Sequence, residues 1–407
     1  MAAKISPARG HDRRRLGYLS AAAVFAIGMA GTTLPTPLYG LYRQELGFSE
    51  LMVTLVFAAY AVGVIVTLLV AGNYSDEAGR RPVLLYALGL SALSAGCFLL
   101  EGGLPLLFAG RVLSGFSAGL LSGVGTVTVL ELAPSERKRR AGLAATAANM
   151  GGLGCGPLLA GLLAEYAPLP LVLPFLAHLV LLSFACAIVL LLPETVEHPR
   201  RLPPLKPQGL SVPPDIRGVF VPCALAAFAG FALLGLFTSI APSFVSETLG
   251  VTNHATAGLV VFTVFLGSTI GQVLVGRMPV GRALPLGCLV LVGGLLLVGA
   301  SLWTESMPLL VAGAVCGGLG QGMAFRAGLT AVSDAAPPAH RGGTISSFFV
   351  VAYTGISLPV VGVGALTLSL GLVGAGLTFT VCATVLAAAT GLYLLRHPPT
   401  APSPSAS

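Results

Sequence analysis

Twelve long apolar runs constrain what this chain can fold into more than any other feature of its sequence. A helix needs about 20 apolar residues to cross a bilayer, and most of the runs reach that length. Only 9% of the 407 residues are charged, whereas a soluble domain carries about 25%. Because lipid-exposed backbone must satisfy its own hydrogen bonds, all twelve runs are predicted to be helical. The runs cover about 17–41, 51–71, 83–100, 104–131, 142–164, 171–192, 218–245, 256–276, 283–302, 308–333, 343–366 and 371–395.

The basic residues predict the orientation of these helices. Most of the 22 Lys and Arg residues lie before the first run, in the loops that follow even-numbered runs, or after the last run. Only Arg43, Arg111 and Arg326 lie elsewhere. The positive-inside rule therefore predicts an inner-membrane, multi-pass protein with both termini in the cytoplasm. The same distribution accounts for the net charge of +7, so nucleic-acid binding is not expected.

The chain divides into two halves that resemble each other. A Pro- and Arg-rich stretch separates them, and the order of residues in 109–119 reappears in 312–322, with Glu131 matching Asp334 and Pro157 matching Pro359. Parallel repeats of this kind place a substrate near the midplane between two bundles. The alternative is chance similarity between helices rich in Gly and Ala. The expected parts are an N-terminal tail at 1–16, six-helix bundles at 17–192 and 218–396, a cytoplasmic loop at 193–217 and a disordered tail at 397–407.

A polar turn after the second run carries the most specific motif of the sequence. It contains Gly72, Asp76, Gly79, Arg80 and Arg81. The spacing resembles the loop signature of the major facilitator superfamily of transporters, although Asn73, Tyr74 and Glu77 depart from it. The resemblance, which extends over about 16–396, implies an all-α membrane protein of 12 transmembrane helices in two pseudo-symmetric six-helix bundles. It also implies that the Asp76–Arg80 loop latches one conformational state. The alternative is an ordinary polar cytoplasmic loop.

The fourth run resembles a second motif of the family. Arg111, Gly115 and Gly119 lie at four-residue spacing, and in the family the arginine is assigned a part in proton transfer. The alternative is an arginine that reaches the outer surface. Glu131 ends this run and is expected to pair with the Asp76–Arg80 loop, in a cluster that would hold the state open to the outside. A solvated helix end is the alternative.

The fifth run resembles a motif associated with proton-coupled antiporters. It contains Gly152, Gly156, Pro157 and Gly161, while Ala160 replaces a glycine of the usual pattern. Glycines let a neighbouring helix approach closely, and a proline inside a helix frees a carbonyl. This resemblance is the main reason to expect export rather than uptake. The alternative is a packing face made of small residues.

Several polar residues inside apolar runs are candidates to line a substrate cavity. In the first run two prolines interrupt the helix among hydroxyl groups, and the seventh run has a partial counterpart. Arg326 is a candidate to bind an anionic group of the substrate or to pair with Asp334. For each candidate the alternative is a kink, a packing residue or an arginine that reaches the interface. The full set is Thr33, Thr36, Tyr39, Tyr42, His178, Thr238, Gln272, Gln321 and Arg326.

Patterns that would indicate an enzyme were not found in the sequence. There is no phosphate-binding Gly-x-x-x-x-Gly-Lys and no His-Glu-x-x-His. The seven cysteines all fall inside apolar runs without paired spacing, so neither a metal nor another cofactor is expected. No Asp or Glu lies in the middle of any run, so proton coupling would have to use Asp76, Glu131, His178, Glu45 or Glu247.

The sequence thus predicts a monomeric transporter in the lipid bilayer that exports a small amphipathic drug or metabolite by alternating access, driven by proton entry. An importer or facilitator of a sugar, organic acid or similar metabolite would share the fold. A membrane-embedded enzyme, or a sensor that does not transport, is less consistent with the residues present.

Overall fold

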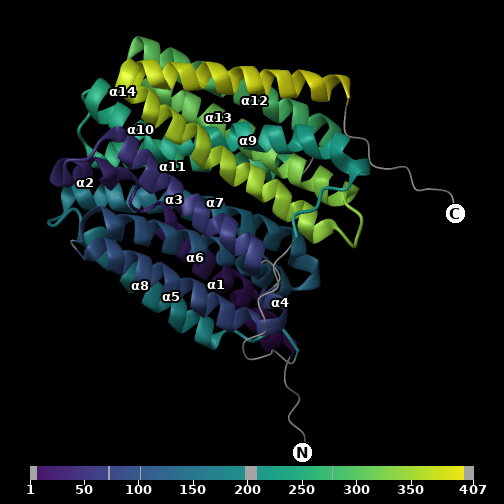
Figure 1. Ribbon diagram of the computed structural model, residues 1–407. Helices are drawn as coiled ribbons and strands as arrows, with labels where there is room; N and C mark the ends of the chain where they lie inside the picture. The colour runs from purple at the N-terminus through teal and green to yellow at the C-terminus, as the bar shows by residue number, and fades with distance from the viewer. Residues whose placement is uncertain (1–6, 72–73, 101, 198–208, 277, 398–407) are drawn as a thin grey trace, which may run out of the picture.

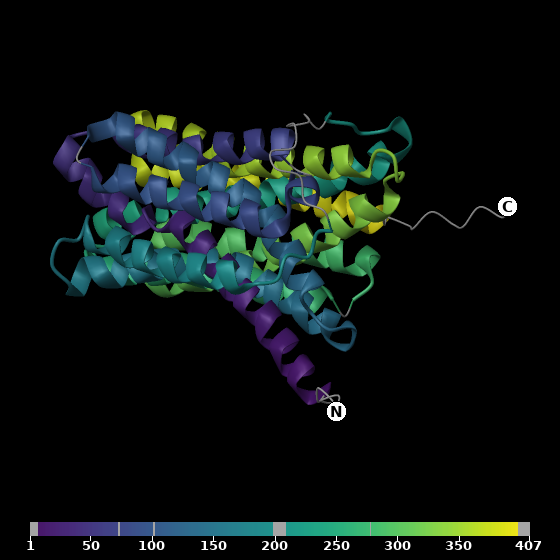
Figure 2. The same cartoon turned by 90° about the horizontal axis from the view of Figure 1, so that it is seen from below.

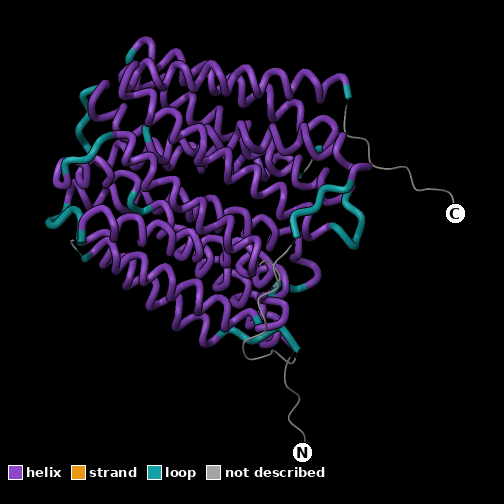
Figure 3. Tube along the Cα trace, viewed as in Figure 1, coloured by secondary structure: helices purple, strands orange, loops and turns teal. Residues whose placement is uncertain are grey.

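The computed structural model describes residues 7–71, 74–100, 102–197, 209–276 and 278–397, with side chains from residue 17 onward. These residues form helices joined by short loops, and none of them is in a strand (Figure 3). The long helices of the first half are α1 (Pro7–Thr33), α3 (Glu50–Ala71), α5 (Arg80–Leu99), α6 (Gly103–Glu131), α7 (Lys138–Tyr166) and α8 (Leu173–Leu191). Those of the second half are α9 (Arg217–Ser239), α11 (His254–Val275), α12 (Val280–Thr304), α13 (Met307–Ala335) and α14 (Arg341–Arg396).

Eleven helices in the described part of the chain are long and apolar enough to cross a membrane. The longest, α14, has 56 residues and would extend about 84 Å at 1.5 Å per residue, far more than the roughly 30 Å of a bilayer core. Gly371 interrupts it with φ 68° and ψ 177°, a conformation that glycine adopts without steric cost. The chain turns back at Gly371, and the segments 341–370 and 372–396 diverge from this shared end (Figure 1). They correspond to the last two apolar runs of the sequence.

The first run is broken at the prolines, as its sequence indicates. α1 begins at Pro7, well before the expected start of the run, and projects from the bundle (Figure 2). It ends at Thr33, and a 3-10 turn over Thr36–Leu38 leads into α2 (Tyr39–Leu46). Proline has no backbone N–H to donate, and its ring clashes with the preceding turn, so the α-helix does not continue through these residues. In the second half, α9 is followed in the same way by α10 (Ala241–Ser243) and a π-helical turn.

The two halves lie side by side, the first in purple to teal and the second in green to yellow (Figure 1). Helix α7 packs against α11, and α3 packs against α14, so these four helices join the halves. Glycine permits the close approach: a Cβ on Gly258 of α11 would lie 2.3 Å from the carbonyl oxygen of Pro157 in α7. We name the two ends of the molecule by their short helices. The α2 end carries α2, and the α4 end carries α4 (Tyr74–Ala78).

Candidate functional site

A central cavity of about 640 Å³ lies between the halves. Helices α1, α3, α6 and α7 line it from the first half, and α9, α11, α13 and α14 line it from the second. Most of its wall is apolar, with seven aromatic side chains: Phe57, Tyr60, Phe231, Phe265, Phe325, Phe349 and Tyr353. Its size is within the range of sites that enclose a drug-sized molecule.

The cavity is open toward the α4 end. Its lining at that end includes residues that are partly or fully accessible, such as Gly123, Thr146 and Thr330. At the other end the lining is buried, and Tyr60 of α3 meets Tyr353 of α14 with ring centroids 6.3 Å apart. The structure is therefore a conformation with access from one side only.

Charged groups join the halves at the α2 end. Arg43 of α2 contacts the Glu50 carboxylate of α3 at 2.8 Å through Nη1, and through Nη2 it contacts Glu247 of the second half. Nearby, the backbone N–H of His254 donates to the Glu165 carboxylate at 2.9 Å, again across the two halves. We call Arg43, Glu50 and Glu247 the α2-end clamp. Opening of the cavity at this end requires the Arg43–Glu247 contact to break.

Arg111 lies at the deep end of the cavity and is only 1% exposed. One guanidinium nitrogen donates to the carbonyl oxygen of Thr32. The guanidinium carbon lies 5.4 Å from the ring centroid of Phe57 and 4.8 Å from that of Tyr60. Its Nε has no hydrogen-bond partner among the described residues. Aromatic faces stabilise a desolvated cation, so Arg111 is buried without a carboxylate beside it.

Arg326 lies nearer the open end, in α13, and its side chain is half-buried. Within the described ranges, its guanidinium has neither a hydrogen bond nor an ion pair. The pairing with Asp334 considered from the sequence is not formed, because that carboxylate is about 12 Å further along the same helix. Arg326 is therefore available to a ligand in the cavity.

Three other predicted cavity residues line the wall: Thr33, Thr238 and Gln272. Their side chains already have partners in the protein. The hydroxyl of Thr33 donates to the carbonyl of Leu153 at 2.6 Å, and that of Thr238 donates to its own helix. They contribute polarity to the wall, and a ligand would have to share or replace these bonds.

The structure places the remaining predicted cavity residues away from this cavity. Thr36 and Tyr39 are buried in the break after α1, and the Tyr42 hydroxyl faces the carbonyl of Phe98 at 3.4 Å. His178 faces Ser91 inside the first half, with 3.1 Å between Nε2 and Oγ. Gln321 accepts a hydrogen bond of 2.6 Å from Ser268 inside the second half. These five side chains lie in packed parts of the protein, and the turn that carries Thr36 contacts both α7 of the first half and α11 of the second.

The loop motif forms a charged cluster around Arg80, which is buried. Its guanidinium contacts Asp76 at 2.5 Å, Glu131 at 2.9 Å and 3.1 Å, and the Ser75 hydroxyl at 2.7 Å. Gly79, with φ 95°, provides the turn before it, while Gly72 lies outside the described residues. All members of this Arg80 cluster belong to the first half. The cluster is formed while the cavity is open at the α4 end, whereas the sequence predicts it for the state open to the outside.

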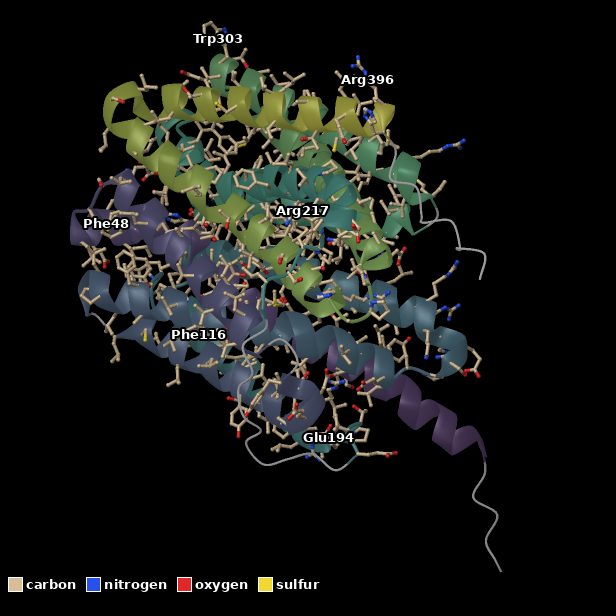
Figure 4. All side chains as sticks on the ribbon, turned by 45° about the vertical axis from the view of Figure 1, so that its right-hand side comes forward. Phe48, Phe116, Glu194, Arg217, Trp303 and Arg396 are labelled. Carbon is tan, nitrogen blue, oxygen red and sulfur yellow. The ribbon has the colours of Figure 1, made fainter. Side chains whose placement is uncertain are left out.

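Glu194 completes this cluster and was not singled out from the sequence. Its carboxylate accepts hydrogen bonds from the backbone N–H groups of Arg80 (2.8 Å) and Arg81 (3.0 Å), at the start of α5. A carboxylate is favoured there because the first N–H groups of a helix lack partners. Burial raises the pKa of Glu194, but the four backbone N–H groups lower it more, so its pKa lies below the usual value. Figure 4 shows Glu194 and Phe48 far apart, toward opposite ends of the first half.

Arg81 ties the same helix start to the end of α8, since its Nη2 donates to the carbonyl of Leu190 at 2.7 Å. The signal for Glu194 in the sequence was Pro193-Glu194-Thr195 directly after the sixth run. The α2-end clamp had a weaker signal: Arg43 was one of three basic residues outside the cytoplasmic pattern. Nothing in the local sequence indicates that Glu50 and Glu247 would meet there.

The glycines of the fourth and fifth runs are contact points between helices. A Cβ on Gly115 would lie 2.2 Å from the carbonyl oxygen of Tyr60, and one on Gly119 would meet Thr67, so α6 packs directly on α3. In α7, Gly152 and Gly156 face α1, while Gly161 faces His254 of α11. Pro157 lies between these faces within the helix. The glycines of this motif therefore let α7 pack closely on α1 of its own half and on α11 of the other half.

A sequence profile described as Major Facilitator Superfamily matches residues 19–358 and 223–407. Twelve apolar runs, paired halves and a cavity between them agree with this match, and the chain belongs to the major facilitator superfamily. The chain is thus a multi-pass membrane protein of a transporter family.

Individual relatives are more distant. The chain is 32% identical over 139 residues to MdtD of Escherichia coli, which is provisionally named a multidrug resistance protein. That match covers 34% of this chain and 28% of MdtD, so the aligned part is about a quarter of the relative's length. The structure resembles a D-xylose–proton symporter (TM-score 0.72, 15% identity, 94% of this chain and 97% of that one). It also resembles the human organic anion transporter MFSD10 (TM-score 0.65, 16% identity, 94% and 99%). At these identities the likeness shows the fold alone.

Proposed function

We propose that this protein exports a small amphipathic molecule from the cytoplasm across the inner membrane, in exchange for protons. The observation that carries the proposal is a drug-sized cavity between two halves, open at the α4 end and shut at the α2 end by a cross-half clamp. Four basic residues lie at the α4 end: Arg80, Arg81, Arg217 and Arg341. The positive-inside rule therefore favours this end as the cytoplasmic one.

Export rather than uptake is supported by the Gly-Pro motif of α7 and by the partial similarity to MdtD. The named substrates of the structural neighbours are a sugar in one case and organic anions in another, so they do not choose between substrates. An importer has the same fold, and the direction of coupling separates the two. In cells with an intact proton gradient an exporter lowers the internal level of its substrate, whereas an importer raises it.

The α2-end clamp supplies a route for proton coupling that needs no carboxylate in the cavity. If the α2 end faces the outside, protons from outside reach Glu247 first and then Glu50. Neutralising Glu247 removes its attraction for Arg43 and frees the halves to separate at this end. Protonation from outside would thereby favour the state that releases substrate outward. Coupling to the gradient further requires that this proton leaves toward the cytoplasm when the halves return, so that a proton enters as substrate leaves.

Inverted membrane vesicles from an overexpressing strain test this function. Respiration acidifies the vesicle interior, and addition of a transported compound should release protons, measured as recovery of the fluorescence of an acridine dye. Vesicles without the protein give the baseline. If a wide panel of drugs and metabolites gives no proton release while reconstituted protein moves one of them down its own gradient, the protein is a facilitator and the proton-coupled proposal is wrong.

A further inference from the structure

We propose that the central cavity binds an amphipathic organic anion, with its acidic group held by Arg326 and its apolar body on the aromatic wall. This substrate class rests on the transport function proposed above. The cavity lining contains two arginines, Arg111 and Arg326, and no Asp, Glu, His or Lys among the described residues. The formal charge of the lining is therefore +2, and most of the remaining wall is apolar.

Arg326 is the anchor because none of the described residues pairs with its guanidinium. Its guanidinium lines the cavity, is half-buried, and has no carboxylate partner within the described ranges. An arginine presents a planar set of N–H donors that matches a carboxylate, sulfonate or phosphate in two parallel hydrogen bonds. A partly desolvated guanidinium without a counter-ion gains most from such a ligand.

Arg111 makes the deep end of the cavity positive as well. Its guanidinium contacts Phe57, Tyr60 and the Thr32 carbonyl, but within the described part of the chain its Nε lacks a hydrogen-bond partner and no carboxylate pairs with it. Its charge acts at the deep end of a mostly apolar wall, where electrostatic effects are stronger than in bulk water. Arg111 therefore raises the preference for anions over the whole cavity, even where the ligand does not touch it.

The aromatic wall beside Arg326 fits the apolar part of the ligand. Phe325 contacts Phe231 at 5.1 Å and Phe349 at 5.9 Å between ring centroids, and Phe349 and Tyr353 are stacked at 6.5 Å. These rings form one surface shared by α9, α13 and α14, in the same cavity that Arg326 lines. A small hydrophilic anion would leave this surface uncovered, whereas an anion with an aromatic or aliphatic body covers it.

The same charges argue against a cationic drug. A cation in this cavity would lose hydration and find two like charges instead of a carboxylate. A neutral molecule would avoid this repulsion but would leave Arg326 unpaired. The order of affinity expected for molecules of one shape is anion, then neutral molecule, then cation.

Matched probes test this order directly. The full-length protein in lipid nanodiscs is titrated by calorimetry with 2-naphthoate, 2-naphthamide and 2-naphthylmethylammonium, and with the corresponding biphenyl and dodecyl series. In at least one series the anion should bind roughly tenfold to hundredfold more tightly than the neutral analogue, the usual effect of a charge-assisted hydrogen bond. Equal affinities, tighter binding of a cation, or no anion binding up to millimolar concentration would overturn the proposal.

Variants locate the anchor. Arg326→Gln should remove most of the preference for the anion over the neutral analogue, and Arg326→Lys should keep part of it, while Arg396→Gln at the exposed end of α14 should leave it unchanged. An unchanged preference in Arg326→Gln would refute the anchor. Binding is measured without a gradient, so it is independent of transport. Intact anion preference without proton-coupled export would refute only the proposed function. Proton-coupled export without a preference for the anion would refute only the substrate class.

Discussion

Arg80, Arg111 and Arg326 show how differently one type of residue is used in this molecule. Arg80 is surrounded by carboxylates, Arg111 by aromatic rings and a carbonyl, and Arg326 by an open cavity. A guanidinium inside the protein must have a partner, reach water or bind a ligand. Arg80 is part of a structural cluster, and Arg326 is part of a binding site. From the sequence the three arginines could be singled out, and the pairing of Arg80 with Asp76 and Glu131 was expected. The aromatic rings and the carbonyl around Arg111 lie on other helices and could not be identified.

Neutralising the acidic partners of Arg80 should destabilise the protein unequally. Asp76 is 58% exposed and makes one contact, so Asp76→Asn should cost at most about 1 kcal/mol, as for a surface ion pair. Glu131 accepts hydrogen bonds from two nitrogens of the buried Arg80 guanidinium, so Glu131→Gln should lower the free energy of unfolding by about 1–2 kcal/mol. Thermal unfolding in detergent measures both. Both variants should fold and export more slowly, and a greater loss of stability in Asp76→Asn would contradict this ranking.

Glu194 should stabilise the start of α5 in a pH-dependent way. Glu194→Ala should lower the free energy of unfolding by about 1 kcal/mol, the usual value of a helix cap. Because the folded state lowers the pKa of Glu194, its contribution is present above the pKa of the unfolded state and is lost as pH falls through the folded pKa. The difference from wild type should therefore be full at pH 7 and shrink below about pH 4. Glu197→Ala, at an exposed position, is the control and should have little effect at either pH.

At the scale of elements, the helices were predictable, but which side of each helix borders the cavity was not. Apolar runs bounded by Gly, Pro and charged turns indicate spans, and the breaks at Pro35 and Gly371 follow from the geometry of those residues. In lipid, however, a wall that faces acyl chains is as apolar as one that faces another helix. The sequence therefore does not tell which side of α1 or α13 borders the cavity. Thr33 lines it while Thr36 does not, and Arg326 lines it while Gln321 does not.

Two neighbouring glycines in α7 test the packing of these helices. A Cβ on Gly156 would lie 2.2 Å from the carbonyl oxygen of Ala30, whereas one on Gly151 would meet nothing within 4 Å. Gly156→Ala should push α1 and α7 apart and cost about 1–3 kcal/mol through overpacking. Gly151→Ala should be neutral or slightly stabilising, since alanine favours a helix. Thermal unfolding in detergent compares them, and equal melting temperatures would mean that the close contact between α1 and α7 does not form.

At the scale of the whole molecule, two halves meet around a cavity that is accessible from one end. The joined helices α7–α11 and α3–α14 are the surfaces on which the halves can tilt, and the α2-end clamp holds one of the two tilts. The division into halves was predictable from the repeat and the central polar stretch. The clamp was not, because Arg43 and Glu247 are brought together only by the way the halves are set against each other.

The distances across both ends test the rocking of the halves most directly. In a background with the seven native cysteines replaced, spin labels at Tyr166 and Trp303 report on the α2 end, and labels at Arg140 and Arg341 report on the α4 end. Pulsed electron spin resonance then compares the parent protein with Arg43→Gln, which releases the clamp, and with Lys138→Gln as the control. Arg43→Gln should lengthen the distance at the α2 end and shorten the one at the α4 end, while Lys138→Gln should change neither. Unchanged distances in Arg43→Gln, or both distances changing in the same direction, would contradict two halves that rock about a shared cavity.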